Sequence, residues 1–242
     1  MRVRVRYTKS GKVKFISHRD LARVFERAIH RAEVPVVYSQ GFTPRPRIQF
    51  GLALSNGYES DAEYLDIEID DERLSAGGSD TAAYAAGMPD LLAPHLPTGV
   101  VVTAATELEQ GTPSLQDAVT SCGWDFDFAD TDPELLAAEA SRLLAESELF
   151  VELERKGKQV REDLRPLLRE LTVERRPDGT LLRAELGTKP RSVRPAELLA
   201  AMRLAEQPRR VLRTHQWITA DSGRREPIEL DPLSPHALER AS

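Results

Sequence analysis

The sequence is poor in cysteine and in long apolar runs. Its single cysteine, Cys122, excludes an intrachain disulfide and, without other ligands, an iron–sulfur cluster or a thiolate zinc site. No apolar stretch approaches the roughly 20 residues that cross a bilayer. The N-terminal residues MRVRVRYTKSGKV alternate and lack the apolar core of a signal peptide. We therefore expect a cytoplasmic protein with no cofactor and no membrane contact.

Motifs that mark common enzyme chemistries are also missing. The sequence has no metal-ligand cluster, no nucleophile elbow and no phosphate-binding loop. Asp66 and Glu68 share one face of an expected strand, and the sequence indicates no distinct partner for either carboxylate. Three histidines lie too far apart to suggest a metal motif: His95, His215 and His236. The sequence predicts no metal site and does not favour an enzyme.

Charge is distributed unevenly along the chain. Residues 1–60 carry 12 Lys and Arg against 4 Asp and Glu, residues 61–154 carry 2 against 22, and residues 155–242 carry 19 against 13. A local basic region can bind polyanions even in a protein of net charge −6, because screening over about 10 Å makes nearby charges dominate. The alternative is an ordinary solvated surface, which is our interpretation of the acidic middle.

The first 110 residues predict the element order β-α-β-β-α-β. Residues 2–7 alternate as a strand with one charged face, which residues 13–16 are expected to continue or pair. Ser17 is a predicted N-cap with Asp20 three residues later, and an amphipathic helix follows until Pro35. Residues 36–38 are strand-like, further strands are expected at residues 48–54, 62–69 and 99–108, and a second helix is expected at residues 82–96. This order is typical of an α+β, ferredoxin-like fold.

A second and weaker copy of this order is predicted downstream. Strands are expected at residues 115–128, 149–155 and 211–219, with a hairpin at residues 172–186. Helices are expected at residues 133–147 after the cap Asp132, at residues 160–170, and at residues 194–204 after the cap Ser192. We therefore predict two tandem halves, residues 1–110 and 111–220, followed by a flexible tail at residues 221–242.

Four arginines recur at every fourth position of the first predicted helix: Arg19, Arg23, Arg27 and Arg31. This arginine ridge spans roughly 18 Å at a rise of 1.5 Å per residue, the scale of several consecutive phosphates. Guanidinium groups bind phosphates bidentately and stack on bases. The alternative is surface charge that pairs with Glu26 and Glu33. Because like charges at this spacing destabilise a helix, we favour a nucleic-acid-binding ridge.

The segment Gly41-Phe42-Thr43-Pro44-Arg45-Pro46-Arg47 is predicted to be a loop stiffened by two prolines. Arg45 and Arg47 are expected to contact phosphates, and Tyr38 and Gln40 precede the loop as stacking or hydrogen-bonding groups. Phe42 has two interpretations. It is a platform on which a base stacks, or it is a core residue, which its residue type favours.

His18 begins the first predicted helix and is expected to lie near Tyr7. The helix dipole disfavours its cationic form, so a neutral base that cleaves RNA is one interpretation. A histidine without a positioned partner is more often structural, and this is the interpretation that we favour.

Several motifs occur together in residues 7–69: Ser17-His18, Arg27-Ala28-Ile29-His30-Arg31-Ala32, Tyr38-Ser39-Gln40-Gly41-Phe42, Pro44, Pro46 and Glu63-Tyr64-Leu65-Asp66. In these the sequence resembles the radical-SAM-linked protein family, a bacterial domain found C-terminal to, or beside, radical SAM proteins. The chain has no Cys-x-x-x-Cys-x-x-Cys motif, so the resemblance implies an accessory domain with a radical SAM partner. It implies no catalytic residues.

Together these features predict an accessory RNA-recognition module, for tRNA or rRNA, that acts with a radical SAM enzyme in RNA modification. The expected nucleic-acid-binding residues are Arg19, Arg23, Arg27, Arg31, Tyr38, Gln40, Phe42, Arg45 and Arg47. Two alternatives stay open. One is a metal-independent RNA endonuclease of the tandem ferredoxin-like type, with His18 as its weak catalytic candidate. The other is a protein-binding scaffold for the radical SAM partner.

Overall fold

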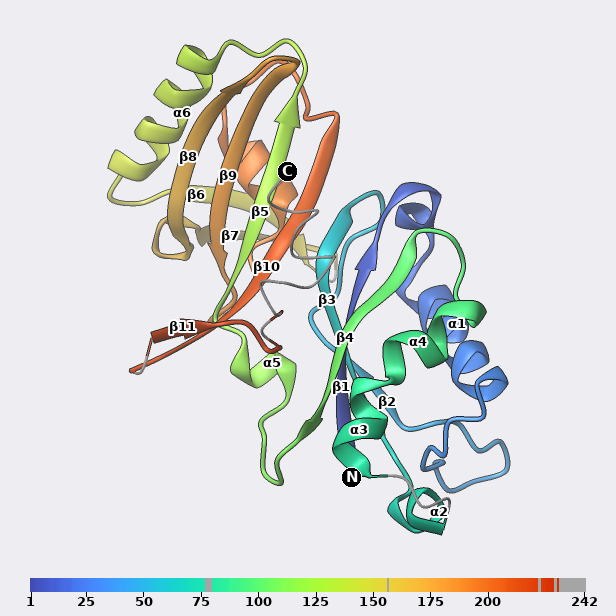
Figure 1. The fold of residues 1–242 in the computed structure, drawn as a ribbon. Helices are drawn as coiled ribbons and strands as arrows, with labels where there is room; N and C mark the ends of the chain where they lie inside the picture. Colours follow the sequence, from blue (N-terminus) through green and yellow to red (C-terminus); the bar gives the residue numbers. More distant parts are fainter. Residues whose placement is uncertain (77–79, 156, 222, 229, 231–242) are drawn as a thin grey trace. The chain divides into compact units, whose positions relative to one another are not determined.

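The computed structural model describes residues 1–76, 80–155, 157–221, 223–228 and 230. The chain divides into two units, Met1–Ala118 with the segment from Arg225, and Val119–Arg224. Both units contain helices and strands, so the protein is of mixed α/β type (Figure 1). Among the described residues, no helix is both long enough and apolar enough to cross a membrane.

Unit 1 contains a sheet whose strands pair in the order β4-β1-β3-β2. All three of these pairings are antiparallel, and β1 places Val5 opposite Leu65 on β3 and Ala105 on β4. The strands expected at residues 2–7, 62–69 and 99–108 are confirmed, whereas the strand expected at residues 48–54 has only three residues. The bounds are β1 Arg2–Lys9, β2 Ile48–Phe50, β3 Glu59–Glu68 and β4 Val100–Leu108.

The helices of unit 1 that lie between β1 and β4 in the sequence pack on one face of this sheet. The bounds are η1 Gly11–Phe15, α1 His18–Arg31, α2 Asp71–Ala76, α3 Thr81–Ala86, α4 Met88–Leu92 and η2 Ala93–His95. Val3 and Val5 of β1 share one hydrophobic core with Phe25 of α1 and Met88 of α4. Because alternate residues of a strand face opposite sides, α1 and the later helices cover the same side of β1.

Two expectations for unit 1 are wrong. Residues 13–16 do not extend the first strand, since Gly11 turns the chain at a φ of +64° into the 3₁₀-helix η1. The helix expected at residues 82–96 is broken into α3, α4 and η2. Gly87 ends α3 by donating its N–H to the Ala83 carbonyl at 3.0 Å, and Pro89 stands in the first turn of α4, where no N–H donor is needed.

The start of α1 agrees with the predicted cap. The Asp20 N–H donates to the Ser17 hydroxyl oxygen at 3.1 Å, and that hydroxyl donates to the Asp20 carboxylate at 2.7 Å. The apolar stripe is also confirmed, because Leu21, Phe25 and Ile29 are buried in the core. Capping and amphipathic spacing are local properties, so the sequence alone predicts where this helix begins and which face it buries.

Unit 2 contains an antiparallel sheet in the order β10-β5-β9-β8, with β11 paired to β10. A separate hairpin is formed by β6 and β7. The bounds are β5 Ser121–Phe128, β6 Phe150–Arg155, β7 Lys158–Asp163, β8 Leu168–Arg176, β9 Gly179–Gly187, β10 Arg210–Ala220 and β11 Gly223–Arg225. The core side of β5 carries Trp124, Phe126 and Phe128, all buried.

The remaining helices are α5 Leu115–Ala118, α6 Pro133–Ala145, η3 Arg165–Leu167 and α7 Pro195–Ala201. The cap Asp132 of α6 is confirmed, since its carboxylate accepts the Glu134 N–H at 2.9 Å. Three expectations are wrong. Residues 115–118 are helical rather than strand, residues 160–170 form β7 and η3 rather than a helix, and α7 follows Arg194 rather than Ser192.

The strands of the two units share one arrangement. In unit 1 the first strand, β1, lies between β4 and β3, and in unit 2 the first strand, β5, lies between β10 and β9. Each first strand is followed in sequence by a helix, α1 or α6. Of the expected tail, residues 222, 229 and 231–242 lie outside the described residues, while Glu226 and Ile228 are buried.

Candidate nucleic-acid interface

The arginine ridge lies on the outward face of α1. Projected at about 100° per residue, its four arginines fall within an arc of about 120°, centred almost opposite the buried stripe. All four side chains are exposed. The helix therefore has two sharply different faces, an apolar one in the core of unit 1 and a cationic one in solvent.

The ridge is only partly neutralised by nearby carboxylates. Arg23 pairs with Asp20 at 3.2 Å on the exposed surface. The Ser17 hydroxyl, with Arg23 and Arg19 nearby, holds the pKa of the Asp20 carboxyl below its usual range. Within the described residues, Arg27 and Arg31 make no ion pair or side-chain hydrogen bond. A cationic surface therefore remains toward the C-terminal end of α1.

The loop at residues 38–47 is held closed at its base by backbone contacts. Tyr38 and Pro46 form an isolated β-bridge, and the Ser39 N–H donates to the Arg45 carbonyl at 2.8 Å. In return, the Arg45 N–H donates to the Ser39 hydroxyl at 3.1 Å. At the tip, Gly41 has a φ of +136°, which side-chain-bearing residues rarely adopt. The loop is thus a short tip on a fixed neck.

The structure overturns the expectation that Phe42 is a core residue. Its relative exposure is 110%, so the whole ring stands in solvent, and Tyr38 is 40% exposed. Gln40 and Arg45 are exposed as well. Arg47 is also exposed but pairs with Glu68 at 3.0 Å. Glu68, for which the sequence indicated no partner, therefore has one.

The loop and the C-terminal end of α1 lie at the same end of unit 1 (Figure 1). The chain leaves α1 at Arg31 and reaches the neck of the loop within a few residues, where Val37 pairs with Glu68 and Arg47. The following strand, β2, then runs back toward the start of the helix, because the Phe50 ring lies 5.0 Å from the His18 ring. Arg27, Arg31 and Arg45 therefore belong to one region of the surface.

His18 is exposed at the first position of α1. Its ring makes an edge contact with the Phe50 ring at 5.0 Å, and the ring of Tyr7 packs on Phe25 at 4.8 Å. In the part of the chain that the structure describes, His18 has no hydrogen-bond partner. The geometry supplies no group that would orient this imidazole as a general base.

The charged face of β1 is buried, which the sequence does not reveal. Arg4 donates to both carboxylate oxygens of Asp66, at 2.8 and 2.9 Å, and both side chains are 2% exposed. Arg6 pairs with Glu226 and is fully buried. Asp66 therefore has the partner that the sequence did not indicate. The alternation of Arg and Val in β1 does not distinguish a buried charged face from a solvated one, because both give a period of two.

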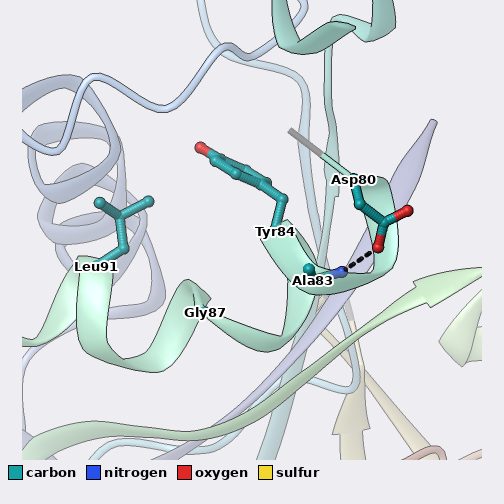
Figure 2. A pocket seen from close by; sticks show the side chains of 5 residues that line it. All are labelled: Asp80, Ala83, Tyr84, Gly87 and Leu91. Atoms are coloured by element: carbon teal, nitrogen blue, oxygen red, sulfur yellow. Dashed lines mark hydrogen bonds between the residues drawn. The ribbon is translucent and has the colours of Figure 1, made fainter. Parts of the chain in front are cut away.

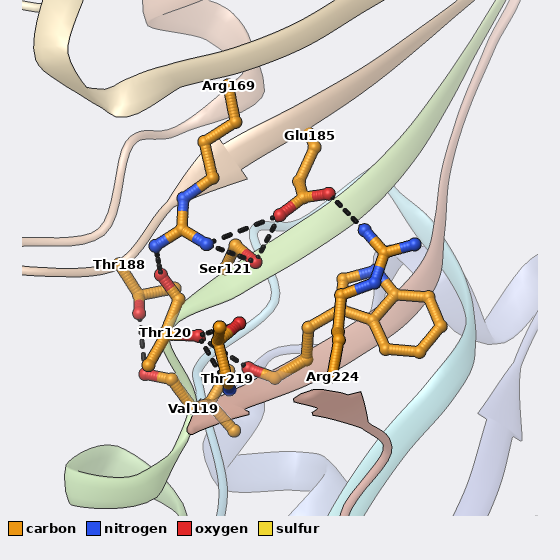
Figure 3. A network of polar contacts seen from close by, with 9 residues as sticks. Val119, Thr120, Ser121, Arg169, Glu185, Thr188, Thr219 and Arg224 are labelled. Atoms are coloured by element: carbon orange, nitrogen blue, oxygen red, sulfur yellow. Dashed lines mark hydrogen bonds and ion pairs between the residues drawn. The ribbon is translucent and has the colours of Figure 1, made fainter. Parts of the chain in front are cut away.

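Unit 2 carries a polar network around Glu185 (Figure 3). Its carboxylate lies between Arg169 at 3.4 Å and Arg224 at 2.5 Å, and it accepts a hydrogen bond from the Ser121 hydroxyl at 2.6 Å. Arg169 also donates to the Thr120 carbonyl at 3.0 Å. These arginines are engaged by protein groups, which distinguishes this network from Arg27 and Arg31 of α1.

A shallow, largely apolar hollow lies between α3 and α4 (Figure 2). It is lined by Ala83, Tyr84, Gly87 and Leu91, and burial raises the pKa of the Tyr84 phenol. The carboxylate at its edge, Asp80, is used to cap α3 through the Ala83 N–H at 2.9 Å. Among the described residues there is no group of three or more His, Cys, Asp or Glu side chains placed to hold a metal ion.

Comparison with known proteins identifies a family. No curated protein matches the sequence significantly. A profile described as "Uncharacterized protein conserved in bacteria (DUF2344)" matches residues 2–195, most of the chain and all of α1 and the 38–47 loop. The chain therefore belongs to the DUF2344 family.

Proposed function

We propose that this protein is an accessory module that recognises RNA, tRNA or rRNA, and acts with a radical SAM enzyme in RNA modification. One observation carries the RNA part of the proposal. The outward face of α1 presents arginines, among them Arg27 and Arg31, that no carboxylate neutralises within the described residues. Arg45 of the 38–47 loop adds a third guanidinium at the same end of unit 1 for which the described part of the chain supplies no ion pair.

The chemistry of this surface suits a phosphate backbone. The ridge extends over roughly 18 Å, and guanidinium groups bind phosphate oxygens through two parallel hydrogen bonds. The net charge of −6 does not oppose this, because the N-terminal 60 residues alone carry 12 Lys and Arg against 4 Asp and Glu. Salt screens charges beyond about 10 Å, so a polyanion at α1 interacts chiefly with the local positive charge.

In the part of the chain that the structure describes, the ridge arginines Arg27 and Arg31 also lack the carboxylate partners that two strand arginines have. Strand arginines such as Arg4 and Arg183 contact carboxylates at 2.8 and 2.7 Å. The sequence offers Glu26 and Glu33 as partners for the ridge, yet neither forms an ion pair with it in the described structure. Like charges four residues apart destabilise a helix by a few tenths of a kcal/mol per pair, which a binding function would offset.

The partner and the location rest on the sequence. The radical SAM partner is inferred from the resemblance of residues 7–69 set out above. We place the protein in the cytoplasm, where RNA-modifying enzymes would meet it, and we assign the acidic residues 61–154 to a protein partner or to solvent.

We further propose that each unit is ferredoxin-like. The support is the strand order β4-β1-β3-β2 in unit 1 and β10-β5-β9-β8 in unit 2, with antiparallel pairing throughout. In unit 2 the hairpin β6–β7 would be an insertion between the first helix and the second strand of the motif.

The proposal is tested by binding of total tRNA and a duplex DNA control to the purified protein over a range of salt concentrations. The variant Arg27→Glu/Arg31→Glu is compared with Arg73→Glu/Arg175→Glu, which makes the same charge change at exposed arginines of α2 and β8. We expect salt-sensitive binding that prefers RNA. The ridge variant should lower the slope of log K against log salt by about 1.4–1.8, since each phosphate contact contributes about 0.7–0.9.

Four results would contradict the proposal. Unchanged RNA affinity in the ridge variant would show that α1 does not contact the RNA. An equal loss of affinity in the control variant would show that only the net charge of the protein matters. Absence of RNA binding at low salt, together with tight co-purification of a radical SAM enzyme, would favour the scaffold alternative. RNA cleavage abolished by His18→Ala would favour the endonuclease.

A further inference from the structure

Two phenylalanine side chains are strongly exposed on unit 1, Phe42 at 110% and Phe15 at 68%. Phe42 is held at the tip of the 38–47 loop, whose neck is closed by the Tyr38–Pro46 bridge. Because the neck is already ordered and Pro44 restricts the segment that returns from the tip, little conformational entropy remains to be lost when a ligand contacts this ring. The exposed Phe42 ring is therefore held in place before a ligand binds.

The second ring lies at the opposite end of α1. Phe15 ends η1 and precedes the N-cap Ser17 by two residues. The ammonium group of Lys14 lies 5.4 Å from the centre of the Phe15 ring, and the same ammonium pairs with Glu59 at 3.5 Å. The Phe15 ring therefore lies beside the positive charge of Lys14. An aromatic ring next to a positive charge suits the binding of a base and its phosphate.

The arginine ridge connects these two ends. Phe15 lies before the first residue of α1 and the Phe42 loop lies beside the last, as the path of β2 from the loop toward His18 requires (Figure 1). The 14 residues of α1 make a helix about 21 Å long at 1.5 Å per residue. At the 3.4 Å spacing of stacked nucleotides, this length corresponds to about six nucleotides.

Exposed rings beside a convex cationic helix distinguish between forms of RNA. The major groove of an A-form duplex is too deep and narrow for side chains to read, and paired bases are already stacked within the duplex. Unpaired bases can be turned outward onto phenylalanine rings while their phosphates meet arginines. Phe42 and Phe15 therefore have a use with unpaired RNA that a duplex does not offer.

We infer that the surface formed by Phe15, the arginine ridge and Phe42 binds an unpaired RNA segment, a loop or single strand of about six nucleotides. Phosphates lie along the ridge and bases stack on the ring at each end. This inference rests on the proposed RNA-recognition function and adds the structural class of the RNA. It also assigns Phe15, which the sequence pattern did not single out.

The test measures the affinity of the full-length protein for a labelled eight-nucleotide RNA of mixed sequence and for the same strand annealed to its complement. Wild type is compared with Phe42→Ala, with Phe42→Leu, which keeps an apolar side chain without a π face, and with Phe42→Tyr, which keeps the ring. Because Phe42 is fully exposed, the thermal unfolding midpoints of these variants should equal that of wild type, so that binding differences report on the ring.

We expect wild type to prefer the single strand. Phe42→Ala and Phe42→Leu should weaken single-strand binding by about five- to hundredfold, the range for loss of one base–aromatic stack, and change duplex binding by less than twofold. Phe42→Tyr should bind like wild type. Phe15→Ala should weaken single-strand binding in the same sense as Phe42→Ala.

The inference and the underlying function fail in different ways. If wild type binds no RNA, or if Arg27→Glu/Arg31→Glu binds as wild type does, the proposed function fails and the inference fails with it. If RNA binding depends on the ridge but the duplex is bound as tightly as the single strand, the inference alone is overturned. Equal effects of Phe42→Ala on both RNA forms would also overturn it.

Discussion

Breaking the buried pair between Arg4 and Asp66 should destabilise unit 1 severely. Arg4 donates from Nε and Nη2 to the two Asp66 oxygens at 2.8 and 2.9 Å, and both side chains are 2% exposed. Two further contacts are weaker, Arg2 to Asp66 at 3.8 Å and Arg4 to the Pro113 carbonyl at 3.4 Å. Asp66→Asn therefore leaves a buried guanidinium without its counter-charge.

The magnitude follows from burial. Removing one partner of a buried ion pair costs about 3–5 kcal/mol, which corresponds to a fall of about 6–20 °C in the unfolding midpoint for a chain of this size. The double variant Arg4→Met/Asp66→Leu replaces both charges by apolar groups and should return to within about 1 kcal/mol of wild type. As a control, Glu174→Gln breaks the exposed Arg183–Glu174 pair and should cost at most about 1 kcal/mol.

Urea unfolding should be followed by circular dichroism, which reports on both units. Both tryptophans of the chain, Trp124 and Trp217, lie in unit 2, so their fluorescence would miss an isolated loss of unit 1. The reasoning is refuted if Asp66→Asn lies within 1 kcal/mol of wild type, or if the double variant is as unstable as Asp66→Asn.

Three further predictions concern local features of unit 1. Ser17→Ala removes the cap of α1 and should cost about 0.5–2 kcal/mol. The Ser17 hydroxyl lowers the folded pKa of Asp20, so wild type should lose this stabilisation as pH falls through the folded pKa. The urea midpoint of the variant, measured across acidic pH, should therefore depend less on pH than that of wild type. Burial lowers the pKa of Lys9, so the cost of burying its charge is present below the folded pKa and is relieved as pH rises from there toward the ordinary lysine value of 10.5. Lys9→Met should abolish this gain in stability at alkaline pH, and an identical gain in both proteins would contradict the reasoning. Gly99 has a φ of +94°, and a Cβ there would lie 2.3 Å from the Ser10 carbonyl oxygen, so Gly99→Ala should lower the thermal midpoint clearly, whereas Gly57→Ala, with a φ of +88° but open space around its Cβ position, should lower it less.

Features decided by neighbouring residues could be predicted from the sequence. The cap at Ser17, the buried stripe of α1 and the cap at Asp132 all depend on residues within about one helical turn. The β8–β9 hairpin also follows from its turn residues. Residues 160–170 were wrongly predicted to be helical. Residues 158–163 instead pair with β6, and this pairing depends on another strand rather than on the local sequence pattern.

The candidate site was predicted in part. The exposure of the arginine ridge follows from helical spacing, and the loop follows from its prolines. The exposure of Phe42 could not be predicted, because a phenylalanine in a loop is buried or exposed according to what packs over it. Phe15 carried no motif, and its exposure depends on the unexpected 3₁₀-helix η1.

The sequence by itself determined the amphipathic first helix, its arginine face and the stiff loop that follows, because these depend on contacts along the chain. Only the tertiary structure decided that Arg4 and Arg6 of β1 are buried while the arginines of α1 are not. Arg4 meets a carboxylate 62 residues away and Arg6 one 220 residues away. A charge can be buried only where the fold brings an opposite charge to it, and no local pattern carries that information.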